Sequence, residues 1–222
     1  MTEQALAICE HMERAFATNE PNANRRNILL HALEVFVRKG IQGARIQDIA
    51  ERAGFSQGYV YRYFRSKEDI FTRLVELAGI GAGDTVRFAA GLELPAWERL
   101  LALAQAMLAQ QGMAALHWRL NALQASAADA LPAQAVEAAQ RTRGLPVAAL
   151  IPLLQEAQRD GDVVAGEPLM LSIAFFSVLQ GLGIARTQVS DAVPFPPAAL
   201  VLRFLQPITK QEKGISQYGE GV

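Results

Sequence analysis

The sequence is short of the residues that build catalytic and metal sites. It contains one cysteine, Cys9, and three histidines, His11, His31 and His117, which lie far apart and in no metal-ligand spacing. A glycine-rich phosphate loop and a nucleophile elbow are both missing. We therefore expect no metal, no cofactor and no catalytic activity. The lone cysteine also excludes a disulfide framework and fits a reducing cytosol.

Charge is missing from one long stretch, Pro168 to Ala185. A membrane span and a buried helix both fit such a run. The stretch begins with proline, contains Ser172, Ser177 and Gln180, and is slightly shorter than the roughly 20 residues that a span needs. We favour a helix buried in a core or between subunits, and we expect a cytoplasmic protein without a membrane partner.

Strand patterns are scarce as well, and apolar residues recur at helical spacing along the 222 residues. We expect an all-α fold. Pro152 lies inside one segment, which is therefore kinked or divided. The predicted helices cover residues 3–17, 25–39, 46–53, 57–64, 66–77, 95–111, 113–127, 131–143, 145–161, 168–187 and 197–206.

Turn formers and glycines divide the chain into four parts. The stretch "NEPNAN" ends an N-terminal extension with a short helix, residues 1–23. Gly79, Gly81 and Gly83 are expected to interrupt or end the helix that opens at Ser66. The remaining parts are a module at 24–78, a larger helical domain at 79–208 and a polar tail at 209–222 that we expect to be disordered.

The net charge of −1 hides an asymmetry between these parts. Ten Lys and Arg and five acidic residues lie between Arg25 and Arg73, a net charge of +5 that leaves −6 for the rest of the chain. Such a split indicates a polyanionic partner for the first module only.

The basic module contains two short predicted helices separated by a glycine turn, "IQDIAERAGFSQGYVYRYF", with the spacing of a helix-turn-helix. Gly54 supplies the turn and Ser56 caps the second helix. The apolar contact between the two helices is expected from Ile49, Ala50, Ala53, Val60 and Phe64.

The other side chains of the second helix are expected to project away from this contact, namely Gln57, Tyr59, Tyr61, Arg62 and Tyr63. Gln pairs with adenine edges in the DNA major groove, Arg pairs with guanine, and apolar rings contact thymine methyls. Ser66 and Lys67 then begin a helix whose free N–H groups and cation suit a phosphate.

At this point the sequence resembles a known family. "DIAERAG" followed by "FSQGYVYRYFRSKEDI" is similar to the DNA-binding domain of tetracycline-repressor-like (TetR/AcrR) transcriptional regulators, over roughly residues 24–78. The resemblance implies an all-helical homodimer, a palindromic operator in double-stranded DNA, and a C-terminal domain that binds a small effector. By position, Gln47, Gln57 and Tyr61 would face bases, and Arg45, Tyr59, Tyr63 and Lys67 would face phosphates.

Two features depart from the family pattern. Ala44 stands where the family usually has a capping Thr or Ser, a loss that typically costs about 1 kcal/mol. The acidic segment at 3–20 also differs from the basic arm that some relatives place in the minor groove, and leaves Arg25 and Arg26 as the only candidates for that contact.

The C-terminal domain carries a candidate ligand pocket, because polar residues at spacings of four and three accompany an apolar helix face. The alternatives are an ordinary core and a polar stripe that faces water. The candidate lining residues are Trp97, Met107, Met113, His117, Trp118, Asn121 and Phe175. The resemblance implies dimerisation through the last two long helices, with candidates Phe176, Leu179, Leu182, Gly183, Leu202, Arg203 and Gln206.

Together, these expectations predict a repressor that dissociates from its operator when a small, mostly apolar effector binds. An activator and a DNA-binding protein without an effector fit the same residues. A helical ligand-binding protein or enzyme is a further alternative, which no catalytic constellation in the sequence supports.

Overall fold

The computed structural model describes residues 1–109, 111–127, 131–189 and 195–207, and these residues form helices joined by turns, with no strand among them. The all-α prediction is confirmed, and the predicted tail at 209–222 lies outside the described residues. The elements are α1 Glu3–Asn19, α2 Ala23–Gly43, α3 Ile46–Ala53, α4 Gln57–Tyr61, α5 Lys67–Ala90, α6 Ala96–Met107, α7 Gly112–Ser126, α8 Ala133–Thr142, α9 Gly144–Arg159, α10 Pro168–Gln188, α11 Ala198–Val201 and the 3-10 helix η2 Leu202–Leu205.

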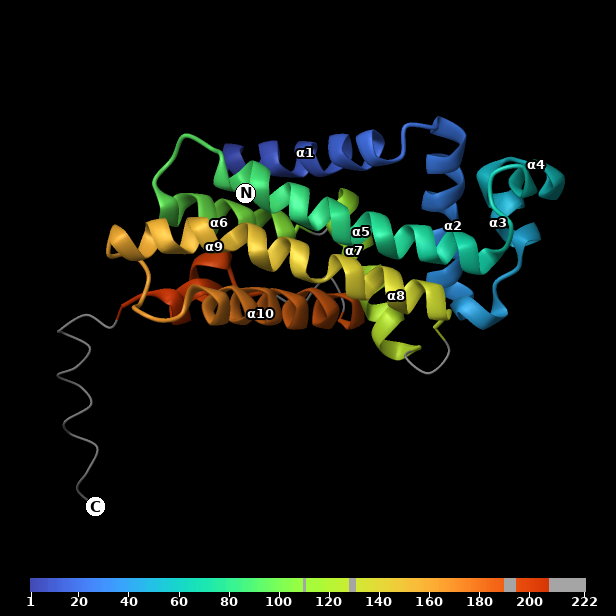
Figure 1. Cartoon of the computed structure of the whole chain (residues 1–222). Coiled ribbons are helices and arrows are strands. Elements are labelled where there is room, and N and C mark those ends of the chain that lie inside the picture. Colours follow the sequence, from blue (N-terminus) through green and yellow to red (C-terminus); the bar gives the residue numbers. More distant parts are fainter. Residues whose placement is uncertain (110, 128–130, 190–194, 208–222) are drawn as a thin grey trace, which may run out of the picture.

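The long helices α1, α5, α9 and α10 lie side by side, and α2, α3 and α4 gather at one end of them (Figure 1). We call α2, α3 and α4 the head, and α1, α6, α7, α8, α9 and α10 the body. Helix α5 runs from the head into the body and packs against α1, α8 and α9 on the way.

Helix α5 belongs to two hydrophobic clusters. Its first half places Ile70 and Phe71 in the head cluster, where Phe71 meets Phe36 of α2 edge to face, with ring centroids 5.5 Å apart. Its second half places Val86 and Ala89 in the body cluster. One uninterrupted helix therefore connects the two cores.

The prediction that glycines interrupt this helix is wrong, because α5 continues through all three of them. A Cβ on Gly79 would lie 2.1 Å from the Thr142 hydroxyl oxygen, and one on Gly83 would lie 3.0 Å from the Cβ of Leu145. The missing side chains thus let α8 and α9 approach α5 closely, which explains why glycine is tolerated inside a helix despite its cost in conformational entropy.

Helix α1, predicted as a separate extension, packs along α5 and α6 of the body. Ala5 and Ile8 are fully buried in the body cluster. The side chain of Thr2 accepts the N–H of Ala5 and so caps the first turn. The N-terminal segment is therefore part of the body core.

The end of α1 is fixed by a buried carboxylate, Glu20, which is 4% exposed. Its two oxygens accept from Nε of Arg25 in α2 and from Nε of Arg73 in α5, each at 3.0 Å. Arg25 also donates to the carbonyl of Tyr63 at 2.8 Å, and Arg73 donates to the carbonyl of Asn19 at 2.6 Å. One carboxylate thus links α1, α2, α5 and the end of the helix-turn-helix.

Several helices differ from the prediction in their extent. The segment with Pro152 is one helix, α9, rather than two pieces. Helix α4 ends at Tyr61 rather than at residue 64, and the predicted helix at 197–206 is a short α-helix followed by the 3-10 turn η2. In each case the chain stays helical or turn-like, so the apolar spacing that signalled the helix is preserved.

Helix α10 is long and apolar enough to cross a membrane. An 18-residue stretch of it has a mean hydropathy of 1.8, and 22% of that stretch is buried inside the protein. Length and composition of this kind are weak evidence of a span, because core helices of soluble proteins share them. In the body, α10 packs against α7 and α9.

We predict that Glu20→Gln lowers the free energy of unfolding by about 1–3 kcal/mol, because two partly buried guanidinium groups lose their shared negative charge. Glu10→Gln is the matched control, since Glu10 lies on the same helix and pairs with Arg14 in solvent at 3.8 Å. That exposed pair contributes less than about 1 kcal/mol. Urea unfolding of both variants measures the difference, and equal effects would contradict the linking role of Glu20.

A second prediction concerns two glycines on α10. Gly183 is buried against α7, and a Cβ there would lie 2.2 Å from Cδ2 of Trp118, whereas a Cβ on Gly181 would meet nothing within 4 Å. Gly183→Ala should therefore destabilise the fold by about 1–3 kcal/mol through overpacking. Gly181→Ala should stabilise it by about 0.5–1 kcal/mol, the helix gain of alanine over glycine. Thermal unfolding of the two variants checks the opposite signs.

Candidate nucleic-acid interface and apolar pocket

The turn between α3 and α4 has the predicted helix-turn-helix geometry. Gly54 ends α3 with φ +74, in the left-handed region that favours glycine. The hydroxyl of Ser56 accepts the N–H of Tyr59 at 3.2 Å and caps α4. Val60 and Phe64 are buried in the head cluster with Ile49 of α3. The predicted apolar contact, cap and turn are confirmed.

The start of α3 is capped without a Ser or Thr, as expected from Ala44. The Asp48 carboxylate accepts the N–H of Arg45 at 3.1 Å, and the ammonium of Lys39 lies 2.7 Å from Asp48. The hydrogen bond from Lys39 holds the pKa of Asp48 below its usual range. The carboxylate thus satisfies the N–H of Arg45, whereas a Ser or Thr hydroxyl at the cap would accept an N–H within the first turn of α3.

The residues predicted to face bases are all exposed. Gln57 lies in the first turn of α4, and Tyr61 at its end is 50% exposed. Gln47 projects from α3, where its amide donates to Glu51 at 2.9 Å. Arg62 follows α4, with its guanidinium 5.4 Å from the ring of Tyr59. These side chains give α4 a polar, outward surface beside α3.

Tyr59 and Tyr63, predicted to face phosphates, are half-buried and bound to each other. Their hydroxyls lie 3.1 Å apart, and the amide of Asn24 donates to both, at 3.0 and 3.1 Å. The hydrogen bond between them raises the pKa of Tyr59 and lowers that of Tyr63. The pair fixes α4 against the start of α2, so a phosphate would meet phenols that are already positioned.

Lys67 makes contacts that the sequence did not indicate. Its ammonium donates to the carbonyls of Gln42 and Ala44, at 2.8 and 3.0 Å. Carbonyls at a helix C-terminus lack partners within the helix, and a lysine commonly satisfies them. Lys67 therefore links the start of α5 to the end of α2. The third N–H of its ammonium group is left for a phosphate, and that contact remains a prediction.

Other cations around the helix-turn-helix stay available for a polyanion. Within the part of the chain that the structure describes, Arg45, Arg62 and Arg65 are exposed and enter no ion pair with an acidic side chain. Arg25 is instead occupied by Glu20 and Tyr63, as described above, and Arg26 donates to the carbonyls of Glu20 and Pro21. Neither arginine forms an arm that reaches away from the head.

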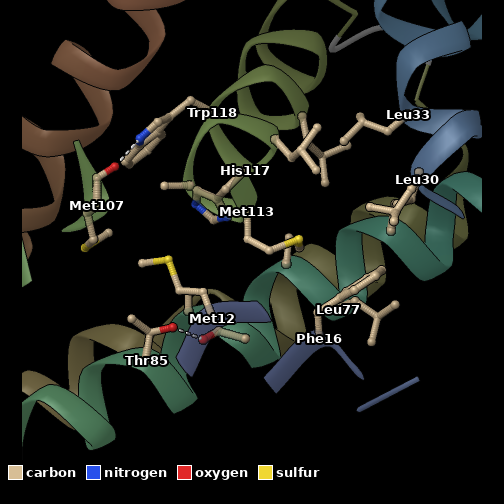
Figure 2. Close-up of a pocket in the computed structure, with 17 residues that line it drawn as sticks. Met12, Phe16, Leu30, Leu33, Leu77, Thr85, Met107, Met113, His117 and Trp118 are labelled. Carbon is tan, nitrogen blue, oxygen red and sulfur yellow. Dashed lines mark hydrogen bonds between the residues drawn. The ribbon is translucent and has the colours of Figure 1, made fainter. Parts of the chain in front are cut away.

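A pocket lies where the head, α5 and the body meet (Figure 2). The space within the pocket and at its open mouth amounts to about 790 Å³. Four predicted residues line it: Met107, Met113, His117 and Trp118. The other lining residues are Met12, Phe16, Leu30, Leu33, Leu74, Leu77, Ala78, Gly81, Ala82, Thr85, Ala114, Leu116 and Leu120.

Three predicted pocket residues lie elsewhere. Phe175 is fully buried in the body cluster, and Trp97 packs on the outside of that cluster. Asn121 lies one turn beyond His117 and accepts from the amide of Gln124 at 3.4 Å. Periodicity identified α7 as a pocket wall but could not show which of its neighbours close the cavity.

The walls from α1 and α2 were missed. Met12 and Phe16 lie four residues apart on one face of α1, and Leu30 and Leu33 lie on α2. Their apolar character was visible in the sequence, but it is equally typical of an ordinary core. Only the packing of α1 beside α7 turns that face into a cavity wall.

The pocket contains few polar groups, and most of them are satisfied. The hydroxyl of Thr85 donates to the carbonyl of Gly81 at 2.7 Å, and the indole N–H of Trp118 donates to the carbonyl of Met107 at 2.6 Å. Burial lowers the pKa of His117 to about 4, so its imidazole is neutral at pH 7. Figure 2 shows the His117 ring near Met113, while Met107 lies next to Trp118, whose indole N–H its carbonyl accepts.

The predicted dimer residues are split between core and surface. Leu179, Leu202 and Gly183 are buried within the chain, so their assignment to a surface between two copies is wrong. Arg203 is exposed, and the remaining candidates, Phe176, Leu182 and Gln206, are partly exposed. The outward apolar side chains are instead Leu169, Met170, Ile173, Leu200 and Phe204, on α10, α11 and η2.

The model of the tetR family of bacterial regulatory proteins matches residues 28–74. The HTH-type transcriptional regulator YfiR of Bacillus subtilis is 42% identical over 60 residues, which are 27% of this chain and 29% of that protein. The HTH-type transcriptional regulator AcrR of Shigella flexneri is 32% identical over 65 residues, 29% of this chain and 30% of that protein. The matches thus span less than a third of each relative.

The fold is shared over a longer stretch. A crystal structure of a TetR-family transcriptional regulator from Agrobacterium tumefaciens superposes on this chain with a TM-score of 0.69 at 21% sequence identity. The superposition includes 84% of this chain and 100% of that one. Residues 28–74, which contain the helix-turn-helix, therefore match the tetR family of bacterial regulatory proteins, and the chain as a whole shares the all-helical fold of the structure from Agrobacterium tumefaciens.

Proposed function

We propose that this protein is a sequence-specific DNA-binding transcriptional regulator of the cytoplasm, which represses its target until a small apolar effector releases it. The observation that carries the proposal is the outward face of α4. Gln57, Tyr61 and Arg62 are exposed on a helix whose other side is fixed by Ser56, Val60 and Phe64. A short, rigidly held helix with such a face suits the major groove.

Binding to a palindrome requires two copies of the chain. The stripe Leu169, Met170 and Ile173 on α10 lies outward, and such a set of exposed apolar side chains favours a contact with a second copy. A dimer of this kind presents two α4 helices, which need a separation of roughly 34–36 Å to reach successive major grooves.

Effector release would act through the walls of the pocket. Leu30 and Leu33 come from the head, Leu77 and Thr85 from α5, and His117 from the body. A ligand that fills the cavity therefore pushes on head and body together, and α5 transmits the displacement because it is a single helix. Allosteric couplings of this type typically amount to about 1–3 kcal/mol, enough to change DNA affinity by 5–150-fold.

The relatives are transcriptional regulators, and we propose no catalytic activity. An activator would use the same interface, and only the response of the target promoter separates it from a repressor. Selection of genomic fragments by the purified protein, followed by a reporter driven by the recovered promoter, tests both points. Recovery of a palindrome that Tyr61→Ala no longer enriches supports the proposal, whereas no enrichment by the wild-type protein at low salt contradicts it.

A base-reading role for α4 predicts that Gln57→Ala relaxes the preference at one base pair of each half-site. The expected loss of discrimination is about 1–3 kcal/mol there and close to zero at the other positions. Fluorescence anisotropy on the operator and its single-base variants measures it. An equal loss of affinity on every sequence would show that Gln57 does not read bases.

A phosphate-binding role for the exposed cations predicts that Arg45→Ala weakens binding to all DNA sequences and reduces the salt slope of log K by about 1. Lys67→Ala should in addition lower the melting temperature, because the carbonyls of Gln42 and Ala44 lose a donor. Arg159→Ala is the control, since Arg159 is exposed and ends α9, far from α4 (Figure 1). A salt slope that Arg45→Ala leaves unchanged would remove Arg45 from the interface.

A further inference from the structure

We propose that the pocket selects uncharged, largely apolar ligands, and that His117 provides the hydrogen bond that orients them. The inference rests on the proposed function, because the ligand would be the effector of that regulator. It goes further by naming the chemical class of the ligand and the residue that determines it.

The wall of the pocket is largely apolar. Among the described residues that line it, none is Asp, Glu, Lys or Arg. Next to this wall, the carboxylate of Glu13 accepts the N–H of Met113 at 3.1 Å and adds negative charge at the start of α7. A ligand anion would therefore lose its hydration without gaining a cation, and a ligand cation would find only apolar side chains.

Few polar groups of the described lining are free to bind a ligand. The hydroxyl of Thr85 and the indole N–H of Trp118 already donate to the carbonyls of Gly81 and Met107. Among the described lining residues, His117 and the Thr85 oxygen, which can still accept, are the remaining strong hydrogen-bonding groups, and His117 is the one that retains a donor. A neutral imidazole has one donor and one acceptor nitrogen, so it can bind a hydroxyl, an amine N–H or a carbonyl on the ligand.

The neutrality of His117 has a physical basis. Burial in the apolar lining, with the Trp118 ring 4.9 Å away, penalises the imidazolium, and this lowers the pKa to about 4. An anionic ligand consequently meets no counter-charge at pH 7. Three methionines, Met12, Met107 and Met113, complete this part of the wall, and their flexible side chains adapt to ligands of different outline. The pocket should thus discriminate strongly by charge and weakly by shape.

A matched pair of fluorescent probes tests the discrimination. N-phenyl-1-naphthylamine and 8-anilino-1-naphthalenesulfonate share one ring system and differ by a sulfonate. We expect the neutral amine to bind with 1:1 stoichiometry and to quench Trp118, and the sulfonate to bind at least fiftyfold more weakly at that site. Competition between the two probes distinguishes the pocket from other surfaces that bind the sulfonate.

Variants locate the binding. Ala82→Phe fills the cavity from α5 and should abolish binding of the amine, while Ala148→Phe, exposed on α9, should leave it unchanged. His117→Leu should weaken the amine five- to tenfold but leave 1-benzylnaphthalene, which has CH₂ in place of N–H, unaffected. His117→Arg should reverse the preference toward the sulfonate. Circular dichroism of each variant confirms that it is folded.

Two outcomes overturn the inference. One is equal affinity of both probes with sensitivity to Ala82→Phe, which would mean that the pocket accepts anions. The other is no saturable binding of either probe to the folded protein. In both cases the DNA-binding measurements on the wild-type protein are independent of the probes, so the proposed regulator stands or fails separately.

Discussion

The buried carboxylate of Glu20 is the contact on which the arrangement of head and body depends. It satisfies two guanidinium groups from different helices, and those groups in turn hold the carbonyls of Tyr63 and Asn19. A buried ion pair costs solvation energy, and it is stable here because each partner makes further hydrogen bonds. The hydrogen bonds of this one carboxylate therefore hold the start of α2 and the first half of α5 against the end of α1.

Helix α5 uses its faces for different purposes. Gly79 and Gly83, four residues apart, face α8 and α9 and bring them close. Ala78, Gly81 and Ala82 face the pocket, and a Cβ on Gly81 would meet nothing within 4 Å. The small side chains on one face make contact possible, and those on the other leave space. The cavity is thus a result of residue size along a single rigid helix.

The sequence predicted the head in detail because the signals there are local. A glycine after α3, a capping Ser56 and the spacing of Val60 and Phe64 depend on residues within one or two turns. The body depended on contacts between distant segments, and there the predictions were weaker. Gly183 was assigned to a surface although it supports Trp118, and α1 was treated as an extension although it closes the pocket. Apolar periodicity shows that a face is buried, but not by which partner.

The course of the chain has a mechanical consequence. Because α1 belongs to the body, the chain enters the head from the body at Glu20 and returns to it through α5, so the head is joined to the body at two places. A domain on one linker can swivel about any axis. A domain on two linkers keeps chiefly the rotation about the line that joins them. The head cluster also contains Leu120 and Leu123 of α7, and α2 packs against α7, so the head is held by this shared core as well as by its two connections.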